Sequence, residues 1–465
     1  MADVVQGAPA AAAAPEPAAK PRRFELTLFS LPHAPLGALG LPPIVFLPPY
    51  YAAQLGIPLE IVSALFLAAR ALDILIDPLL GEWQDRTRAR IGRRKLWMII
   101  STPILMFAIW LAFIGVGPGV NVYGLAATIF TLYAMFAAMV IAHLGWASEL
   151  RADYHGRTNV LGGVQIAAMI GATLILLLPG IVRAAGWGDD ADAVHVMGWT
   201  ILITLPIAVL VSVLFVREPD IPVHEKISLK LAIGAIFTNK HLRGVLLPDL
   251  LFGVAQGVSG GLFLFYFQYA LGFDTQAQIL LFIYFVSGVL GVPIWMALGK
   301  RIGKHRSLQC ACLYAAAITF CIPLIPHGQF VPALILMAIA GLHQGASNML
   351  LRAMLADVID ADRLKTGQAR AGLFNSLLLI TSKAGLATGP VTYAVLALYG
   401  FQTELRGNNS PEAMAALDAM FIVAPAVIFL IAAVSLRIYR LDEAAQRAIR
   451  AELEAVQSAQ RAQSQ

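Results

Sequence analysis

The sequence predicts an all-α integral membrane protein with twelve transmembrane helices in two six-helix bundles, and three observations lead to this fold class. Of the 465 residues, 58% are hydrophobic and only 13% are charged, whereas soluble domains carry about 25% charged residues. Long apolar segments recur along the whole chain. The basic residues between these segments are concentrated in alternate loops, which is typical of a membrane protein.

The apolar segments are long enough to cross a bilayer as helices. A spanning helix needs about 20 apolar residues for a hydrocarbon core of ~30 Å. By this measure the sequence predicts spans at approximately 32–54, 59–83, 96–117, 122–148, 158–184, 196–217, 243–271, 276–299, 308–326, 330–355, 372–400 and 413–437. None of them has the alternating pattern of a barrel strand of about 10 residues.

The net charge of +5 is explained by topology and needs no nucleic-acid partner. Lys and Arg are concentrated in the loops at 84–95, 149–157, 217–243, 299–306 and 356–371 and in both tails, and only Arg183 and Arg406 depart from this pattern. Because basic loops stay on the cytoplasmic side, both termini are predicted to be cytoplasmic.

The domain organisation follows from the longest polar interruption, which comes after the sixth span. We expect a disordered cytoplasmic tail at 1–23, an N-terminal bundle at 24–217, a cytoplasmic linker with an interfacial helix at 218–242, a C-terminal bundle at 243–437 and a cytoplasmic tail at 438–465. The first tail is rich in Ala and Pro and lacks the apolar core of a signal peptide.

The two halves contain a weak parallel repeat between their second and third spans. Pro78 precedes Arg86 by eight residues, as Pro293 precedes Arg301, and a Gly–basic turn follows each pair. Such a repeat is typical of transporters whose halves are related by an axis along the membrane normal.

The first span contains an unusual number of prolines, at Pro32, Pro35, Pro42, Pro43, Pro48 and Pro49. Proline removes a backbone donor, and irregular backbone is tolerated at membrane depth only beside protein or a water-filled cavity. The span is therefore expected to line the interior of the protein, although a kinked packing helix would also fit.

Three charged residues lie on one face of the second span. Arg70, Asp73 and Asp77 are separated by three and four residues, so a helix places them on one stripe. A single charge near the bilayer centre costs about 2.5–3.5 kcal/mol or more, so this stripe cannot face lipid. It must face a cavity or form ion pairs. A purely structural ion-pair network is the alternative to a coupling-ion site.

Lys383 in the eleventh span balances these charges, because Arg70 and Lys383 oppose Asp73 and Asp77. A cation bound at the two aspartates would leave surplus positive charge, which favours an anionic or polyhydroxyl solute. This is one physical route to symport. Aromatic and amide side chains in other spans predict a substrate site, although they also suit helix packing; they are His143, Trp146, Gln256, Tyr266, Gln344 and Asn348.

One stretch resembles a known signature. ARALDILIDPLLGEWQDRTRARIGRRKLW is similar to the signature of the glycoside–pentoside–hexuronide:cation symporters, the melibiose-permease branch of the major facilitator superfamily, and GWASELRADYHGRT, MLADVIDADRLKTGQARAGLF and ITSKAG follow in the same order. The resemblance implies symport by alternating access, with cation-site aspartates at Asp73 and Asp77. It assigns the arginine of helix two to Arg70 and the lysine of helix eleven to Lys383.

The same resemblance implies that Trp146 stacks against a sugar. It also implies a cytoplasmic gate loop in which charged pairs hold the inner side closed, formed by Asp85, Arg86, Arg93 and Arg94.

Departures from the pattern of the symporter family change which solute and which coupling ion are expected. Gly37 and Ala142 stand where the family has sugar-binding aspartates, so galactoside binding of that type is not expected. Ile76 and Met139 replace two oxygen-bearing Na⁺ ligands. Two carboxylates suffice for a proton, so H⁺ is the expected coupling ion, and Na⁺ at Asp73 and Asp77 is the alternative.

These features predict a monomeric, multi-pass inner-membrane transporter, not an enzyme, that moves a glycoside, pentoside or uronide-type solute with H⁺. No other cofactor is expected, and no GxxxxGK[ST] nucleotide motif is present. The alternatives are a lysolipid or amphiphile transporter, or a drug exporter, on the same fold. A membrane enzyme or sensor would need a nucleophile–base pair, which His143 and Ser148 do not convincingly form.

Overall fold

The computed structural model describes residues 23–117, 119–150, 154–188, 190–219, 229–273, 276–366, 370–403, 409–439, 441, 445–449, 451–453 and 455. These residues form helices joined by short connections, and no strand occurs among them. The helices of the first half are α1 (Arg23–Ser30), α2 (His33–Gly40), α3 (Pro42–Val45), α4 (Leu47–Ala53), α5 (Leu59–Arg86), α6 (Arg93–Phe113), α7 (Val122–Glu149), α8 (Tyr154–Ile175), α9 (Leu178–Ala184) and α10 (Asp190–Phe215).

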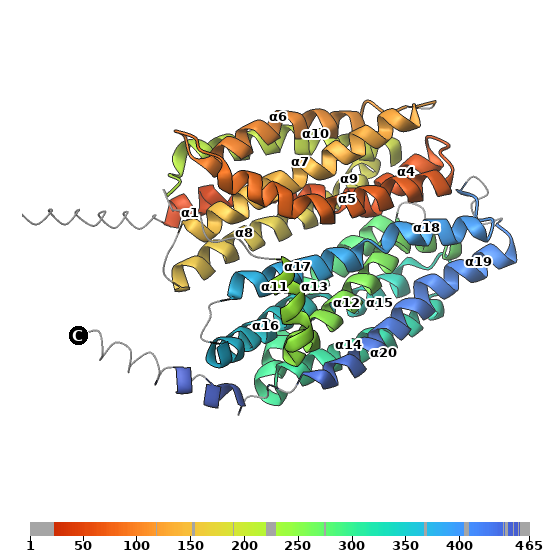
Figure 1. Cartoon of the computed structure of the whole chain (residues 1–465). Coiled ribbons are helices and arrows are strands. Elements are labelled where there is room, and N and C mark those ends of the chain that lie inside the picture. The colour runs from red at the N-terminus through yellow and green to blue at the C-terminus, as the bar shows by residue number, and fades with distance from the viewer. Residues whose placement is uncertain are drawn as a thin grey trace, which may run out of the picture.

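The second half begins with α11 (Leu229–Thr238), in the segment where the interfacial helix is predicted. It continues with α12 (Lys240–Phe265), α13 (Gln276–Ile302), α14 (Lys304–Cys321), α15 (Phe330–Gly341), α16 (Gln344–Thr366), α17 (Ala371–Leu386), α18 (Gly389–Leu398), α19 (Pro411–Asp418) and α20 (Ala424–Ser435). Figure 1 shows α1–α10 as one bundle and α11–α20 as a second bundle beside it.

Within the described residues, ten helical segments are long and apolar enough to cross a membrane. They coincide with ten of the twelve predicted spans. The two remaining spans are the second, α5, and the eleventh, which is divided into α17 and α18 at 387–388. α5 carries Arg70, Asp73 and Asp77, and α17 carries Lys383, so both segments are less apolar than a typical spanning helix. Their positions in the bundles nevertheless fit the twelve-helix fold.

The first span is irregular, as its prolines predict. It is divided into α1, α2, α3 and α4, with interruptions at 31–32, 41 and 46. Pro42 begins α3, and Pro48 stands at the start of α4, where a missing N–H is tolerated. The first span is therefore a series of short helices, and not all of its backbone carbonyls accept a hydrogen bond from within the span.

Glycines allow the first and fifth spans to pack closely, and likewise the seventh and eleventh. A Cβ atom at Gly37 would clash with the carbonyl oxygen of Ala168, where α2 crosses α8. In the second half, a Cβ at Gly385 would lie 2.6 Å from the Cα of Gly253, where α17 crosses α12. Close packing at glycines therefore occurs at corresponding helix crossings in the two bundles.

The predicted repeat is confirmed at the start of α6 and α14. Gly92 precedes α6 with a φ of 106°, and Gly303 precedes α14 with a φ of 92°. Both values lie in the left-handed region that favours glycine. Each glycine follows a long helix that contains a proline, Pro78 in α5 and Pro293 in α13.

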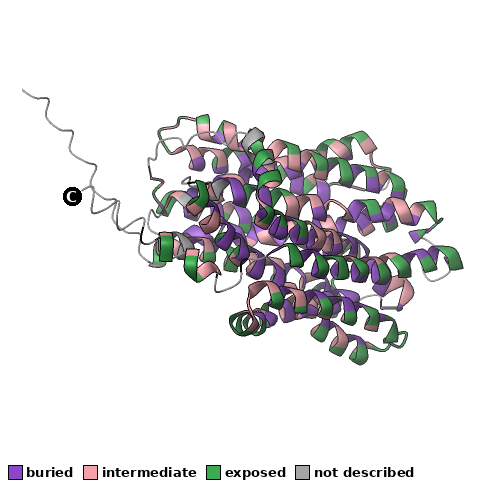
Figure 2. Ribbon diagram, turned by 60° about the horizontal axis from the view of Figure 1, so that its bottom comes forward, coloured by how far each residue is buried: buried purple, intermediate pink, exposed green. Residues whose placement is uncertain are grey.

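The outer faces of the bundles are apolar. Figure 2 shows exposed residues on the outside of the helices and buried residues between them. Large hydrophobic side chains are among the exposed ones, including Leu75, Phe107, Leu210, Leu290 and Leu324, each more than half exposed. Apolar surface of this extent is unusual on a soluble monomer and fits contact with lipid.

The two bundles meet mainly at one end of the molecule. Contacts between them are made by α3 and α4 against α12, by α5 against α17 and α18, and by α8 and α9 against α13. In Figure 1, α4 and α18 lie together at the end opposite to α1. We call the end formed by α3, α4, α18 and the first half of α5 the closed end.

Candidate functional site

The central feature is an ion pair between the two bundles. Lys383 on α17 places its Nζ 3.1 Å from Oδ1 of Asp73 and 2.5 Å from Oδ2 of Asp77, both on α5. The aspartates are one helical turn apart, so one ammonium group can reach both. The structure therefore brings Lys383 to two residues that lie 310 and 306 positions before it in the sequence.

Arg70 completes the charge cluster from the same face of α5. Its Nη1 lies 3.7 Å from Oδ2 of Asp73, and its guanidinium lies 4.9 Å from the ring centroid of Tyr133 on α7. An arginine over an aromatic ring gains a cation–π attraction. The cluster thus contains two cations and two anions, as the sequence predicts.

Burial gives these charges unequal surroundings. The side chain of Asp73 is 3% exposed, that of Asp77 is 17% exposed and that of Lys383 is 22% exposed. Asp73 is held by both cations, whereas Oδ1 of Asp77 is buried without a hydrogen-bond partner among the described residues. Asp77 is consequently the carboxylate with an unused oxygen, and it lies nearer to solvent than Asp73.

A second carboxylate fixes the helix that carries Lys383. Asp249 on α12 accepts hydrogen bonds from Thr381 Oγ1 at 2.6 Å and from Ser382 Oγ at 2.8 Å. These two residues directly precede Lys383 in α17. Asp249 is itself buried, so the interaction ties α17 to α12 and sets the position from which Lys383 reaches the other bundle.

The predicted substrate residues of α7 are buried in the N-terminal bundle. His143 stacks on Phe29 at a centroid distance of 4.3 Å and lies 4.7 Å from the ring of His33. Trp146 packs edge-on against Phe29, and the ammonium of Lys95 lies 5.4 Å from its ring centroid. Neither His143 nor Trp146 has exposed surface, so no face of the indole is open for stacking in this conformation.

The predicted substrate residues of the second half are partly brought together. Nε2 of Gln256 on α12 donates to Oε1 of Gln344 on α16 at 3.2 Å. Tyr266, which directly follows α12, stacks on Phe421 and is 2% exposed. The side chain of Asn348 lies outside the described residues. Gln256 and Gln344 thus form a polar contact between two helices, while Tyr266 belongs to an aromatic cluster.

The departures from the symporter pattern have a structural basis. Gly37 lies where α2 crosses α8, so an aspartate there would clash with the backbone at Ala168. Ala142 and Met139 are fully buried in the N-terminal bundle.

The predicted gate loop forms a compact network. Nη2 of Arg94 lies 2.6 Å from Asp85 and 2.9 Å from Glu149 at the end of α7, and Arg93 lies 2.8 Å from Glu149. Arg94 and Glu149 are both less than one-tenth exposed. Arg86 lies apart from this network, because it pairs with Glu82 on the exposed side of α5.

Two acids of this network were not among the predicted site residues. Glu149 stands in the stretch GWASELRADYHGRT and joins both arginines, and Glu218 accepts hydrogen bonds from the backbone N–H of Arg94 and Lys95 at 2.9 Å each. Carboxylates are favourable at a helix N-terminus, which explains the position of Glu218. The basic run after Gly92 was a signal that buried acids should lie nearby.

The second half has a counterpart of this network. Nζ of Lys304, the first residue of α14, lies 2.6 Å from Asp357 on α16, as Arg93 and Arg94 meet Glu149 on α7. The hydroxyl of Tyr439 also donates to Asp357, at 3.2 Å. Burial and the adjacent carboxylate raise the pKa of Tyr439 far above its ordinary value, so the hydroxyl keeps its proton. The sequence repeat therefore extends to the ion pairs.

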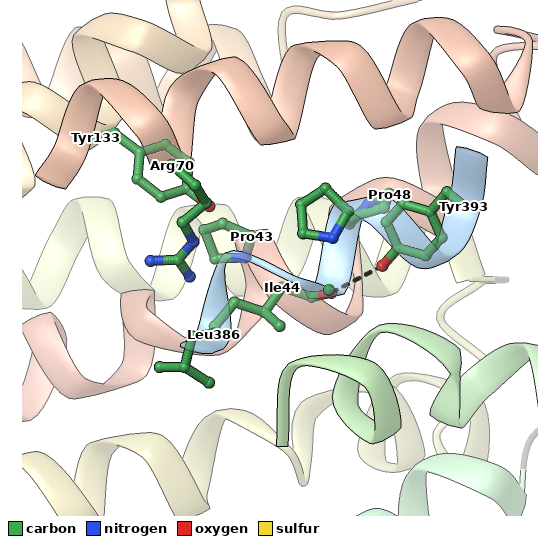
Figure 3. Close-up of a pocket in the computed structure, with 9 residues that line it drawn as sticks. Pro43, Ile44, Pro48, Arg70, Tyr133, Leu386 and Tyr393 are labelled. Carbon is green, nitrogen blue, oxygen red and sulfur yellow. Dashed lines mark hydrogen bonds between the residues drawn. The ribbon is translucent and has the colours of Figure 1, made fainter. Parts of the chain in front are cut away.

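A small cavity lies beside the charge cluster, toward the closed end. It is partly open, and Figure 3 shows Arg70, Tyr133, Pro43, Ile44, Pro48, Leu386 and Tyr393 around it. The lining comes from both bundles. Arg70 belongs to the charge cluster, and Pro43 and Pro390 belong to α3 and α18, so the cavity lies between the cluster and these two helices.

Comparison with known proteins agrees with the fold and the residues. Residues 28–443 match the family described as MFS/sugar transport protein. The isoprimeverose transporter of Lactiplantibacillus pentosus is 25% identical over 408 residues, which cover 85% of this chain and 84% of that protein.

A lipid transporter is about equally similar. The human sodium-dependent lysophosphatidylcholine symporter 1 is 24% identical over 441 residues, covering 85% of this chain and 79% of that protein. Among solved structures, the nucleoside transporter NupG superposes with a TM-score of 0.64 at 16% identity, covering 90% of this chain and 98% of that one. The last similarity concerns the fold alone.

Proposed function

The chain belongs to the MFS/sugar transport protein family, and from that premise we propose that it is an H⁺-coupled symporter of a glycoside, pentoside or uronide-type solute. We place it in the inner membrane as a multi-pass protein with both termini in the cytoplasm. The solute site lies between the bundles, and the two bundles rock about it by alternating access.

One observation carries this proposal: Lys383 of one bundle binds Asp73 and Asp77 of the other at 3.1 and 2.5 Å. A cation that binds the aspartates offsets the negative charge that attracts Lys383, whichever carboxylate oxygen it takes. Binding therefore changes the interaction free energy between the bundles, which is what coupling of an ion to a conformational change requires.

The oxygen supply at the site favours a proton over Na⁺. Hard metal cations prefer several oxygen ligands. Here the neighbouring positions hold Ile76 and Met139, which offer no side-chain oxygen, and the ammonium of Lys383 occupies the space next to Asp77. A proton needs only one carboxylate oxygen, and Oδ1 of Asp77 is not engaged by the described residues.

The released cations suit the proposed solute. When Asp77 is protonated, Arg70 and Lys383 oppose only Asp73, which leaves one surplus positive charge between the bundles. Polyhydroxyl or carboxylate-bearing solutes can bind such cations through charge-assisted hydrogen bonds. This supports a sugar or uronide in preference to an apolar solute.

The test measures the thermal stability of the purified protein with isoprimeverose, a phenyl glucuronide or lysophosphatidylcholine, each with Na⁺ or choline and at several pH values. We expect one of the two sugars to stabilise the protein, with no dependence on Na⁺. Proteoliposomes supplied with that sugar should take up protons with it. Stabilisation by millimolar Na⁺ would overturn the proton assignment, and a response to lysophosphatidylcholine alone would make the chain an amphiphile transporter.

A further inference from the structure

One hydrogen bond between the bundles at the closed end joins a tyrosine to a backbone carbonyl. The hydroxyl of Tyr393 on α18 lies 3.2 Å from the carbonyl oxygen of Ile44 on α3 and 3.2 Å from that of Gly261 on α12. Tyr393 and Gly261 belong to the second bundle, and Ile44 belongs to the first. Figure 3 shows the bond to Ile44 at the edge of the cavity.

The carbonyl of Ile44 is available because of a proline. In an α-helix the oxygen of residue 44 would accept from the N–H of residue 48. Position 48 is Pro48, which has no N–H, and the helix is interrupted at Phe46 between α3 and α4. Ile44 is half-buried, and a net hydrogen bond contributes about 1 kcal/mol, so an external donor to this carbonyl is favoured.

The donor to the Ile44 carbonyl comes from the other bundle, so separation of the bundles would remove it. Tyr393 is 1% exposed and its ring lies 5.8 Å from Phe265, so its position is fixed within the second bundle. If the bundles separate at this end, the hydroxyl keeps Gly261 and leaves Ile44. A second bond, from Ser63 Oγ on α5 to the carbonyl of Pro390 at 2.7 Å, crosses the same boundary.

We propose that Tyr393 holds the closed end shut by donating to the Ile44 carbonyl that Pro48 leaves without its helical donor. Tyr393 is a positioning residue: it sets the balance between conformations and need not touch the solute. The inference rests on alternating access, which is part of the proposed function, but not on the identity of the ion or the solute.

The test follows the opening of the closed end directly. Cys310, Cys312 and Cys321 are replaced by alanine, and Leu386→Cys, which lines the cavity, serves as the reporter. The rate at which a membrane-impermeant maleimide labels this cysteine in spheroplasts scales with the open fraction. Since a net hydrogen bond contributes about 1 kcal/mol, Tyr393→Phe should raise the rate roughly five-fold.

A matched control removes a buried hydroxyl that does not cross between bundles. Tyr51 donates to the carbonyl of Ala112 at 2.8 Å inside the first bundle, so Tyr51→Phe should leave the labelling rate unchanged. An equal increase in Tyr51→Phe, or no increase in Tyr393→Phe, would overturn the proposal.

The role of Pro48 is tested by a double-mutant cycle. Pro48→Ala supplies the N–H that an α-helix offers to Ile44, so Tyr393→Phe should then change the rate by less than about two-fold. An undiminished five-fold effect in that background would show that the freed carbonyl is not the cause. Pro49→Ala is the control, because its N–H would serve the carbonyl of Val45, and the effect of Tyr393→Phe should persist.

A second measurement does not depend on the orientation of the protein in the membrane or on transport. Spin labels at Gln54 and Tyr399, which are exposed on opposite bundles at the closed end, report their separation in purified protein. Tyr393→Phe should enlarge the population with the longer distance, and Tyr51→Phe should not. A protein that accumulated no sugar would still show this shift, so a failed transport assay and a failed gate proposal are distinguishable.

Discussion

Lys383 on α17 lies 2.5 Å from Asp77 on α5, and this ion pair joins the two bundles of the molecule near their charged centre. A contact of this length between charged groups is a strong hydrogen bond. Under the proposed rocking of the bundles these two residues separate, so a ligand of Asp77 is expected to act on the conformational equilibrium.

Neutralising Asp77 should abolish coupling without preventing folding. We expect Asp77→Asn to be made in normal amount, to lose accumulation of solute against its gradient and to retain exchange down the gradient, because the carboxylate that takes the proton is gone. The measurement compares accumulation with equilibrium exchange in vesicles, using the sugar identified by the stability screen.

Glu60→Gln on the same helix is the control, since Glu60 is exposed and far from the ion pair. It should accumulate solute as the wild type does. Full accumulation by Asp77→Asn would exclude the carboxylate as the coupling group.

Replacing Lys383 alone should lower the stability of the protein more than replacing Lys383 and Asp77 together. Lys383→Ala leaves Asp73 and Asp77 facing each other, and breaking a buried ion pair costs about 3–5 kcal/mol. Lys383→Ala combined with Asp77→Asn should be more stable than Lys383→Ala alone, because Arg70 then balances the remaining Asp73. Midpoints of thermal unfolding measure the difference, and strictly additive losses would contradict it.

Glu149 should be important for stability at the end of the bundle where α6 begins. It is 9% exposed and binds Arg93 and Arg94, so Glu149→Gln should lower the free energy of unfolding by about 3–5 kcal/mol. The comparison is Glu82→Gln, whose partner Arg86 is 62% exposed and whose loss should cost no more than about 1 kcal/mol. Equal effects of the two changes would argue against a buried network.

Trp146 should contribute to the stability of the protein in the conformation described. The indole is fully buried against Phe29 and Lys95, so Trp146→Ala should destabilise the protein by about 3–5 kcal/mol. Unfolding midpoints of the purified variant measure the loss. Trp110, which is 41% exposed on the outer face, is the control and should cost far less when changed to alanine.

A milder substitution at the same position tests the sugar-stacking prediction. If Trp146 stacks on the solute in another conformation, Trp146→Phe should fold and bind the sugar more weakly. Unchanged affinity in Trp146→Phe would confine the residue to packing.

Much of this molecule is predictable from local sequence features. The ten apolar helices follow from the length and composition of their segments, and the interruptions of the first span follow from its prolines. The spacing of Arg70, Asp73 and Asp77 places them on one face of any helix that contains them. The glycine–basic turns predict that Gly92 and Gly303 occupy corresponding places in two related halves.

Other relationships depend on which helices become neighbours. No feature of the sequence sets the distance between Lys383 and Asp77, and none shows that Trp146 is enclosed by Phe29 and Lys95. Likewise, nothing local indicates that Glu149 joins Arg93 and Arg94, because the acid lies on α7 and the two arginines lie on α6.

The sequence by itself determined the membrane-embedded helical fold, the charged stripe of α5 and the free carbonyl behind Pro48, because these depend on residue type and on spacing within one segment. Tertiary structure alone decided that Lys383 meets Asp77 and that Tyr393 meets Ile44, since each contact joins two bundles that are far apart in the chain. Their association is fixed by the summed packing of many side chains, and no single segment encodes it.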